Sequence, residues 1–154
     1  MKNGQWDRYF YGIALTVASQ SKCLSRQIGA VLVRDKIVIC TGYNGPPRSM
    51  AHCGETFIQC PRRMAGYSSG EGLHLCPATH AEQNCIAQAA RLGIQVKDST
   101  MYMTCEIPCK TCMGILINSG VTELVCTSLV FYDFVTENIV RDSNLVIRKF
   151  SFME

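Results

Sequence analysis

Two short segments of this chain carry the residue types that hold a catalytic zinc ion. They are His80-Ala81-Glu82 and Pro108-Cys109-Lys110-Thr111-Cys112. His80, Cys109 and Cys112 offer one nitrogen and two thiolates, which leaves one position of a tetrahedral zinc ion open. Glu82 then lies beside the metal without binding it, where a carboxylate can accept a proton from water and pass it on. Any fold of this chain must therefore bring two separate segments together at one point.

The carboxylate that is not a ligand distinguishes two interpretations of this motif. A structural zinc site is closed by four protein ligands and needs no carboxylate beside an open position. The alternative is a non-catalytic zinc module that binds a partner protein or nucleic acid. Replacing Glu82 by alanine separates the two, because a catalytic role predicts that turnover is lost while zinc and fold remain.

Both halves of the motif are expected at helix amino-termini. Residues two apart in the middle of a helix do not face one another, so His80 and Glu82 require a helix that begins at this point. Cys109 and Cys112 are three residues apart, so both sulfurs can face one point from a single helix. Pro108 fits at or next to the first helical position, and a helix amino-terminus lowers the pKa of a thiol.

Length and composition predict one globular domain over residues 1–154. The chain has 154 residues, of which 47% are hydrophobic and 18% are charged, which is enough for a sizeable core. The amino-terminal segment lacks the pattern of a secretory signal, and no stretch approaches the roughly 18 to 20 apolar residues of a membrane span. The net charge of +3 suits a phosphorylated small molecule and is too weak to indicate a nucleic-acid surface.

Ten cysteines in a chain of this length indicate metal binding. Because no secretory signal is recognised, we expect a cytoplasmic protein whose thiols are reduced. Four of the cysteines lie in apolar segments and are expected to pack in the core: Cys40, Cys85, Cys105 and Cys126.

Residues 48–79 form a segment rich in cysteine and glycine, with little periodicity. A structureless loop of this length is unusual inside a compact domain, so something should hold it. We expect a second, structural zinc ion bound by Cys53, Cys60 and Cys76, with Cys23 as the best candidate for the fourth thiolate. The alternative is that these cysteines are free and pack as small hydrophobic residues, since their spacings match no compact zinc finger.

The hydrophobic periodicity predicts an α/β fold. Helices are predicted over residues 5–21, 80–92, 109–118 and 133–142, and strands over residues 28–33, 37–41, 99–104, 122–127 and 145–150. The first two strands form a hairpin, and the later strands alternate with helices. This order predicts a mixed five-stranded sheet that is largely parallel, has one antiparallel pair from the hairpin, and is covered on both faces.

Residues 42–47, with the sequence GYNGPP, are expected to form a rigid loop with unusual backbone angles. Such a loop can be no more than a turn. At the end of a strand beside a metal site it can also clamp a nucleotide. The sequence leaves both interpretations open.

Together these segments resemble the cytidine deaminase superfamily, and more closely the deoxycytidylate (dCMP) deaminases. The paired motifs H-x-E and P-C-x-x-C are shared by zinc-dependent nucleobase deaminases. Residues 21–31 (SKCLSRQIGAV) and 80–84 (HAEQN) also belong to the match, and the GYNG sequence and the cysteine-rich insert resemble the dCMP deaminases in particular. In one departure, three residues separate Thr104 from Pro108 where the family has two. The resemblance covers most of the chain and implies a three-layer α/β/α cytidine deaminase-like fold.

The resemblance implies hydrolysis of dCMP to dUMP and ammonia, a step in the synthesis of dTMP precursors. Glu82 takes a proton from zinc-bound water, protonates N3 of the base and later protonates the departing amine. By similarity, Asn44 binds the 3′-hydroxyl and the backbone N–H of Ala81 holds the base carbonyl. Arg26 and Tyr132 are candidates for binding the 5′-phosphate. The alternatives are a solvated arginine at the start of the hairpin and a tyrosine packed in the core.

The resemblance also implies a homohexamer that dCTP activates together with Mg²⁺ and that dTTP inhibits. The effector is expected near the GYNG loop and a subunit interface, with Gly45 and Arg48 as contacts. Competing enzymatic interpretations are a tRNA adenosine deaminase and a deaminase of free cytidine, guanine or dCTP. The modest net charge argues mildly against the tRNA enzyme, which needs a more basic surface.

Overall fold

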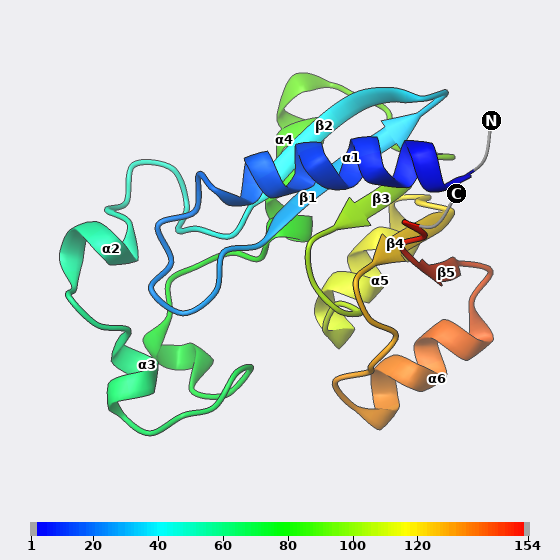
Figure 1. Ribbon diagram of the computed structural model, residues 1–154. Helices are drawn as coiled ribbons and strands as arrows, with labels where there is room; N and C mark the ends of the chain where they lie inside the picture. The colour runs from blue at the N-terminus through cyan, green and yellow to red at the C-terminus, as the bar shows by residue number, and fades with distance from the viewer. Residues whose placement is uncertain (1–2, 153–154) are drawn as a thin grey trace.

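The computed structural model describes residues 3–152 and shows a sheet with helices on both faces (Figure 1). In chain order the elements are α1 (Asn3–Ala18), β1 (Gly29–Arg34), β2 (Ile37–Tyr43), α2 (Cys53–Thr56), α3 (Pro61–Met64), η1 (Leu73–Leu75), α4 (Ala81–Leu92), β3 (Thr100–Met103), α5 (Lys110–Asn118), β4 (Glu123–Cys126), α6 (Phe134–Asp142) and β5 (Val146–Lys149). Every predicted helix and strand is present, with bounds that differ by a few residues.

The five strands form one mixed sheet in the order β2-β1-β3-β4-β5. Strand β1 is antiparallel to β2 and also to β3, whereas β3, β4 and β5 run parallel. The mixed five-stranded sheet is thus confirmed, but the expectation of a single antiparallel pair is wrong. Strand β2 of the hairpin lies at the edge of the sheet, so the other side of β1 pairs with β3.

Helix α1 covers one face of the sheet, and helices α4 and α5 cover the other. Alternate residues of β1 point to the two faces. Val31 packs with Phe10 on the α1 side, and Leu32 packs with Cys85 and Met113 on the α4 and α5 side. The predicted three-layer arrangement is therefore confirmed, and the larger of the two cores lies beneath α4 and α5.

The four cysteines predicted to pack in the core are all buried: Cys40, Cys85, Cys105 and Cys126. All ten cysteines of the chain are free thiols in this structure. Among the described residues, no helix has both the length and the apolar character that crossing a bilayer demands.

The predicted loop over residues 42–47 is in part the end of a strand. Gly42 and Tyr43 belong to β2, and no residue from 42 to 47 has a positive φ, so the prediction of unusual backbone angles is wrong. A Cβ atom at Gly42 would lie 2.5 Å from the carbonyl oxygen of Ala81 and 2.5 Å from the nitrogen of Cys85. Glycine is required here because helix α4 lies against the strand.

The cysteine-rich insert, residues 48–79, is built from short helical turns and is not structureless. It contains α2, α3 and η1, and it extends to one side of the sheet beside the segment that follows α1 (Figure 1). The nitrogen of Gly54 donates a hydrogen bond of 3.0 Å to the carbonyl oxygen of Lys22, and Lys22 also forms an ion pair with Glu55. The insert is thus attached to the chain between α1 and β1.

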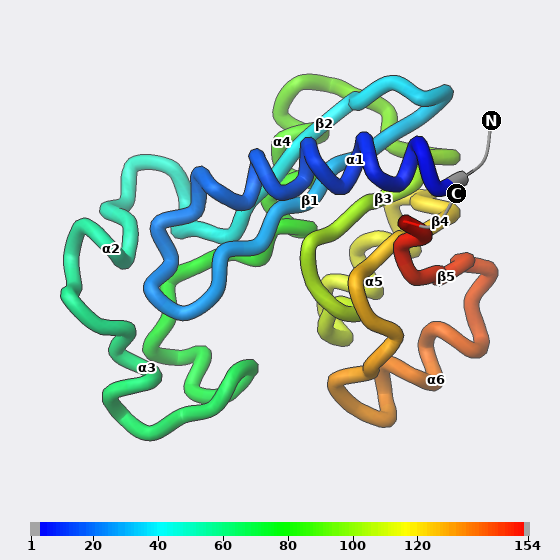
Figure 2. Tube along the Cα trace, in the orientation of Figure 1, coloured from blue at the N-terminus to red at the C-terminus, as the bar shows by residue number. Residues whose placement is uncertain are grey.

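The two ends of the described chain lie side by side at the β5 edge of the sheet (Figure 2). Asp7 of α1 is fully buried. Its two carboxylate oxygens accept hydrogen bonds of 2.6 and 2.8 Å from Arg148 of β5, and one of them also accepts a bond of 2.9 Å from the nitrogen of Ser151. This buried charge pair joins the first helix to the last strand.

Replacing Asp7 by asparagine will lower the free energy of unfolding by about 3 kcal/mol. That value is at the lower end for breaking a buried ion pair, because Arg148 keeps a second partner, Glu123, at 2.8 Å. Urea denaturation measures the change. Asp142→Asn is the control, since its pair with Arg141 is exposed and is expected to contribute less than about 1 kcal/mol. Equal stability of the two variants would contradict the prediction.

Candidate metal centre

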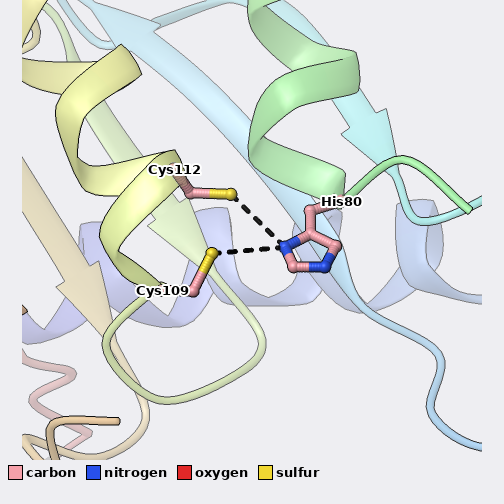
Figure 3. Close-up of side chains that lie close together, drawn as sticks. All are labelled: His80, Cys109 and Cys112. Atoms are coloured by element: carbon pink, nitrogen blue, oxygen red, sulfur yellow. Dashed lines mark hydrogen bonds between the residues drawn. The ribbon is translucent and has the colours of Figure 1, made fainter. Parts of the chain in front are cut away.

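The two halves of the metal motif meet at the amino-termini of α4 and α5 (Figure 3). His80 is the residue that caps α4, and Cys109 is the residue that caps α5. Nδ1 of His80 lies 3.6 Å from Sγ of Cys109 and 3.4 Å from Sγ of Cys112. The three ligand atoms all lie within 4.8 Å of one another, so the predicted convergence is confirmed.

These distances fit a zinc ion. Zinc–nitrogen and zinc–sulfur bonds of about 2.0 and 2.3 Å at a tetrahedral angle place the two ligand atoms about 3.5 Å apart. The observed separations of 3.6 and 3.4 Å agree with this value. Within residues 3–152, no further histidine, cysteine or carboxylate belongs to this group. A bound ion therefore keeps one position that no protein ligand takes.

Local hydrogen bonds fix the histidine ligand in place. The backbone of His80 is extended, with φ −69° and ψ 157°, and its N–H donates a bond of 3.1 Å to Oε1 of Gln83 in the first turn of α4. The side-chain amide of Asn84 donates a bond of 2.8 Å to the carbonyl oxygen of Tyr43 at the end of β2. The start of α4 is thereby attached to the sheet edge.

The start of α5 determines the positions of Cys109 and Cys112. Cys109 has extended backbone angles, and the helix begins at Lys110. Pro108 thus precedes the capping residue and does not occupy the first helical position. Because Cys112 lies in the first turn, its sulfur and that of Cys109 point to the same side, as Figure 3 shows.

The two sulfurs have opposite tendencies to ionise. A hydrogen bond from the Cys112 thiol, assisted by one from His80, lowers the pKa of Cys109 to about 4. The same bond, together with burial, raises the pKa of Cys112. A metal ion that both sulfurs bind requires both of them as thiolates.

Glu82 lies in the first turn of α4, and its side chain is buried, with 4% of the residue exposed. Burial raises the pKa of this carboxyl group, and the neighbouring His80 and Cys112 act in the opposite direction. Glu82 lies in the wall of the cavity that His80 and Cys109 line, and it is not one of the three ligands.

A cavity of about 420 Å³ opens beside two of the three ligands, His80 and Cys109. Its walls include His80, Cys109 and Glu82. The cavity lies between the insert, which contributes residues 69–70, and the segment before α6, which contributes residues 132–133. The four residues predicted to bind substrate all line it: Arg26, Asn44, Ala81 and Tyr132.

Asn44 and Ala81 are held rigidly at the cavity wall. Oδ1 of Asn44 accepts a bond of 2.9 Å from the nitrogen of Ile28, and Nδ2 donates a bond of 2.8 Å to the carbonyl oxygen of Arg26. Ala81 is the first residue of α4 and is buried, so its N–H belongs to the turn whose donors have no partner within the helix. Oδ1 and Nδ2 of Asn44 can each form one further hydrogen bond, so both residues still have polar groups for a ligand.

Arg26 is not a free cation. Its two terminal nitrogens each donate a bond of 2.7 Å to one oxygen of Glu106, and Arg26 lowers the pKa of Glu106 to about 2. The pair is ionised and carries no net charge. Glu106, which was not anticipated from the sequence, lies in the segment between Thr104 and Pro108 that departs from the family pattern.

Tyr132 is 44% exposed, which contradicts the alternative that it packs in the core. A residue not anticipated from the sequence, Arg62 of α3, also lines the cavity and is buried. No local pattern distinguishes Arg62 from its exposed neighbour Arg63, so only the fold of the insert identifies it.

The four cysteines proposed as ligands of a second zinc ion line one small cavity. Cys23, Cys53, Cys60 and Cys76 all border it. Burial raises the pKa of Cys53, and the other three thiols raise it further. Within the described part of the chain, however, these four sulfurs do not form a group whose members all lie within 4.8 Å of one another.

The two residues proposed to contact an effector lie apart from the metal-centre cavity. Gly45 pairs with Thr79 through hydrogen bonds of 3.1 and 2.8 Å, so its backbone groups are already used, and it borders the cysteine-lined cavity. Arg48 is exposed and donates a bond of 3.4 Å to Gln88. The GYNG segment therefore contributes Asn44 to one cavity and Gly45 to the other.

Comparison with known proteins shows one family. Residues 4–128 match the family described as the cytidine and deoxycytidylate deaminase zinc-binding region. The chain is 37% identical over 150 residues to a deoxycytidylate deaminase of Saccharomyces cerevisiae, an alignment that covers 97% of this chain and 46% of the yeast protein. It is 38% identical over 130 residues to a deoxycytidylate deaminase of Mycobacterium phage D29, covering 81% of this chain and 96% of the phage protein.

The fold is also found in a solved structure. The crystal structure of the dCMP deaminase of cyanophage S-TIM5 in complex with dCMP and dUMP has a TM-score of 0.74 and 19% identity, and the alignment covers 97% of this chain and 98% of that one. At this identity the likeness concerns the fold. The chain spans less than half the length of the yeast relative and nearly all of the phage relative.

Proposed function

Because the chain belongs to the cytidine and deoxycytidylate deaminase family, we propose that it hydrolyses dCMP to dUMP and ammonia. The observation that carries this proposal is the set of three ligands with an open position, next to a buried carboxyl group in a cavity. A zinc ion held there supplies a Lewis acid that makes a water molecule nucleophilic near neutral pH. We propose that residues 1–154 act as one deaminase domain.

The residues of the cavity have separate roles in this proposal. Glu82 accepts a proton from the attacking water and passes it to N3 of the cytosine ring. It then takes the second proton from the hydroxyl group added at C4 and gives it to the amine, so that the C–N bond breaks and ammonia leaves. The N–H of Ala81 donates to the base carbonyl, and Asn44 binds the 3′-hydroxyl of the deoxyribose. Tyr132 borders the nucleotide at the open side of the cavity. Arg26 contacts the phosphate only if it exchanges one of its bonds to Glu106.

Ammonia release from four substrates tests the proposed function. The purified, zinc-loaded protein is incubated separately with dCMP, dCTP, deoxycytidine and cytidine. We expect the highest kcat/KM with dCMP. Preference for dCTP or cytidine would assign the chain to another branch of the family, and release from none of the four would favour a tRNA substrate or a non-catalytic zinc module.

We further propose the regulation and assembly that the family resemblance implies. The protein is then a cytoplasmic homohexamer that contributes to dTMP precursor synthesis, activated by dCTP with Mg²⁺ and inhibited by dTTP. Rates of dCMP hydrolysis with and without each triphosphate test the regulation, and unchanged rates would refute it. Sedimentation equilibrium tests the hexamer.

We also propose a second, structural zinc ion between Cys23, Cys53, Cys60 and Cys76. The proposal is supported by the observation that all four thiols border one small cavity. To bind one zinc ion together, the four sulfurs must move to the spacing of a tetrahedral site.

We expect two zinc ions per wild-type chain and one in Cys53→Ser, measured by atomic absorption after dialysis. Cys126→Ser replaces a buried cysteine in β4 and is expected to keep both ions. A single ion in the wild-type chain would refute the second site.

A further inference from the structure

Arg62 is a buried arginine without an acidic partner. Only 9% of the residue is exposed, and among the described residues no carboxylate lies within ion-pair distance of its guanidinium group. Its Nη1 atom donates bonds of 2.6 and 3.4 Å to the carbonyl oxygens of Glu71 and Ser68. Burial of an uncompensated positive charge is costly, so this position favours an anion that the protein chain does not supply.

Two nitrogens of the Arg62 guanidinium group have no hydrogen-bond partner among residues 3–152. Nε is one of them, and it is buried away from solvent; no bond uses Nη2 either. Nη2 can therefore donate a charge-assisted bond to a phosphate or carboxylate, and Nε can add a second, parallel bond only when the anion displaces the atoms that cover it. The carbonyl bonds at Nη1 hold the group in place.

Arg62 also lies where a nucleotide would extend away from the metal centre. It lines the cavity that contains His80 and Glu82, and it borders an adjoining hollow of about 420 Å³. Ser25 and Ser69 border both spaces as well. The boundary between the two spaces therefore combines a buried cation with two hydroxyl groups.

The other arginine of the cavity does not offer the same charge. Both terminal nitrogens of Arg26 are bonded to Glu106, so that pair is neutral as a whole. Two arginines at this boundary have no acidic partner among the described residues: the buried Arg62, and the exposed Arg63, whose Nε donates a bond of 3.1 Å to the hydroxyl of Ser25. Of the two, only Arg62 also lines the cavity of the metal centre. A phosphate monoester carries about 1.5 to 2 negative charges at neutral pH, and such a group matches the positive charge and the unpartnered donors of Arg62.

We propose that Arg62 binds the 5′-phosphate of the nucleotide at the boundary bordered by Ser25 and Ser69, and so makes the site select a nucleotide over a nucleoside. This inference rests on the proposed function, because it concerns the substrate of that same site.

Kinetics with dCMP and deoxycytidine test the role of Arg62. In Arg62→Gln we expect KM for dCMP to rise about 10- to 100-fold, as for the loss of a charge-assisted hydrogen bond, while kcat/KM for deoxycytidine stays within about twofold of wild type. Arg62→Lys keeps the charge without the fork and should recover part of the loss. Calorimetry with dUMP should show a fall in affinity of similar size.

Arg34→Gln is the matched control. Nη1 of Arg34 donates bonds of 2.6 and 3.3 Å to two backbone carbonyl oxygens, the same arrangement as in Arg62, but Arg34 does not line the cavity. We expect no change in the preference for dCMP in this variant. If Arg62→Gln destabilises the insert, Arg62→Lys provides the comparison, with a smaller rise in KM for dCMP alone.

The possible results distinguish a failure of this inference from a failure of the proposed deaminase function. An equal loss of kcat/KM with both substrates in Arg62→Gln would mean that Arg62 has a structural role. An unchanged KM for dCMP would mean that the phosphate binds elsewhere. Either result overturns the inference and leaves the proposed deamination intact. Failure of the wild-type protein to deaminate either substrate would refute the proposed function. In that case, tighter binding of dUMP by wild type than by Arg62→Gln would still support the anion site.

Discussion

Replacing Glu82 by glutamine will lower kcat for dCMP by about 10²- to 10⁴-fold, the usual contribution of a general acid–base group. Glutamine keeps the shape of the side chain but cannot accept the proton from water. The carboxyl group is buried beside the three ligands and is not one of them, so zinc content and the free energy of unfolding should stay close to those of wild type. Ammonia release, atomic absorption and urea denaturation measure the three quantities.

Glu137→Gln is the control for this prediction. Glu137 lies in the first turn of α6, as Glu82 lies in the first turn of α4, but it is exposed and does not line the cavity. The control should keep full activity. Loss of zinc from Glu82→Gln would show that the carboxylate is needed for the metal centre itself, and undiminished turnover would remove it from the reaction.

Replacing Cys112 by serine will abolish binding of the catalytic zinc ion and reduce activity by more than about 100-fold. Even the hydrogen-bond partners of zinc ligands contribute about 10- to 100-fold, and Cys112 is one of three ligands placed at bonding distance. The oxygen of serine is a poorer zinc ligand than a thiolate, and the remaining histidine and cysteine cannot close the site. Atomic absorption should show one zinc ion fewer per chain than in wild type.

Cys126→Ser controls for the replacement of a buried cysteine by serine. Cys126 is as fully buried as Cys112 but lies in β4, where its thiol donates a bond of 3.2 Å to the carbonyl oxygen of Ser128. We expect this variant to keep its zinc content and its activity. Normal zinc content in Cys112→Ser would mean that a different set of residues holds the ion.

Much of the fold follows from patterns that are local in the sequence. Alternating and helical periodicities predicted the five strands and the four longer helices, because burying one face of a strand or helix requires those spacings. They did not predict the short helices α2, α3 and η1 of the insert. The pairing of β1 with β3 did not follow, since the order of strands in a sheet depends on how distant segments pack. The reason for glycine at position 42 could not be predicted from the sequence either, because glycine is required there by the close approach of α4 and not by a turn.

The sequence by itself determined which three side chains converge on a possible metal site, because the chemistry of zinc restricts which side chains can hold it and their spacing places Cys109 and Cys112 on one side of a helix. It also predicted a role in proton transfer for Glu82, which the substitution by glutamine tests. Only the tertiary structure decided the charges around the cavity. It paired Arg26 with Glu106 and buried Arg62 without a carboxylate, because the partner and exposure of an arginine depend on segments far away in the chain.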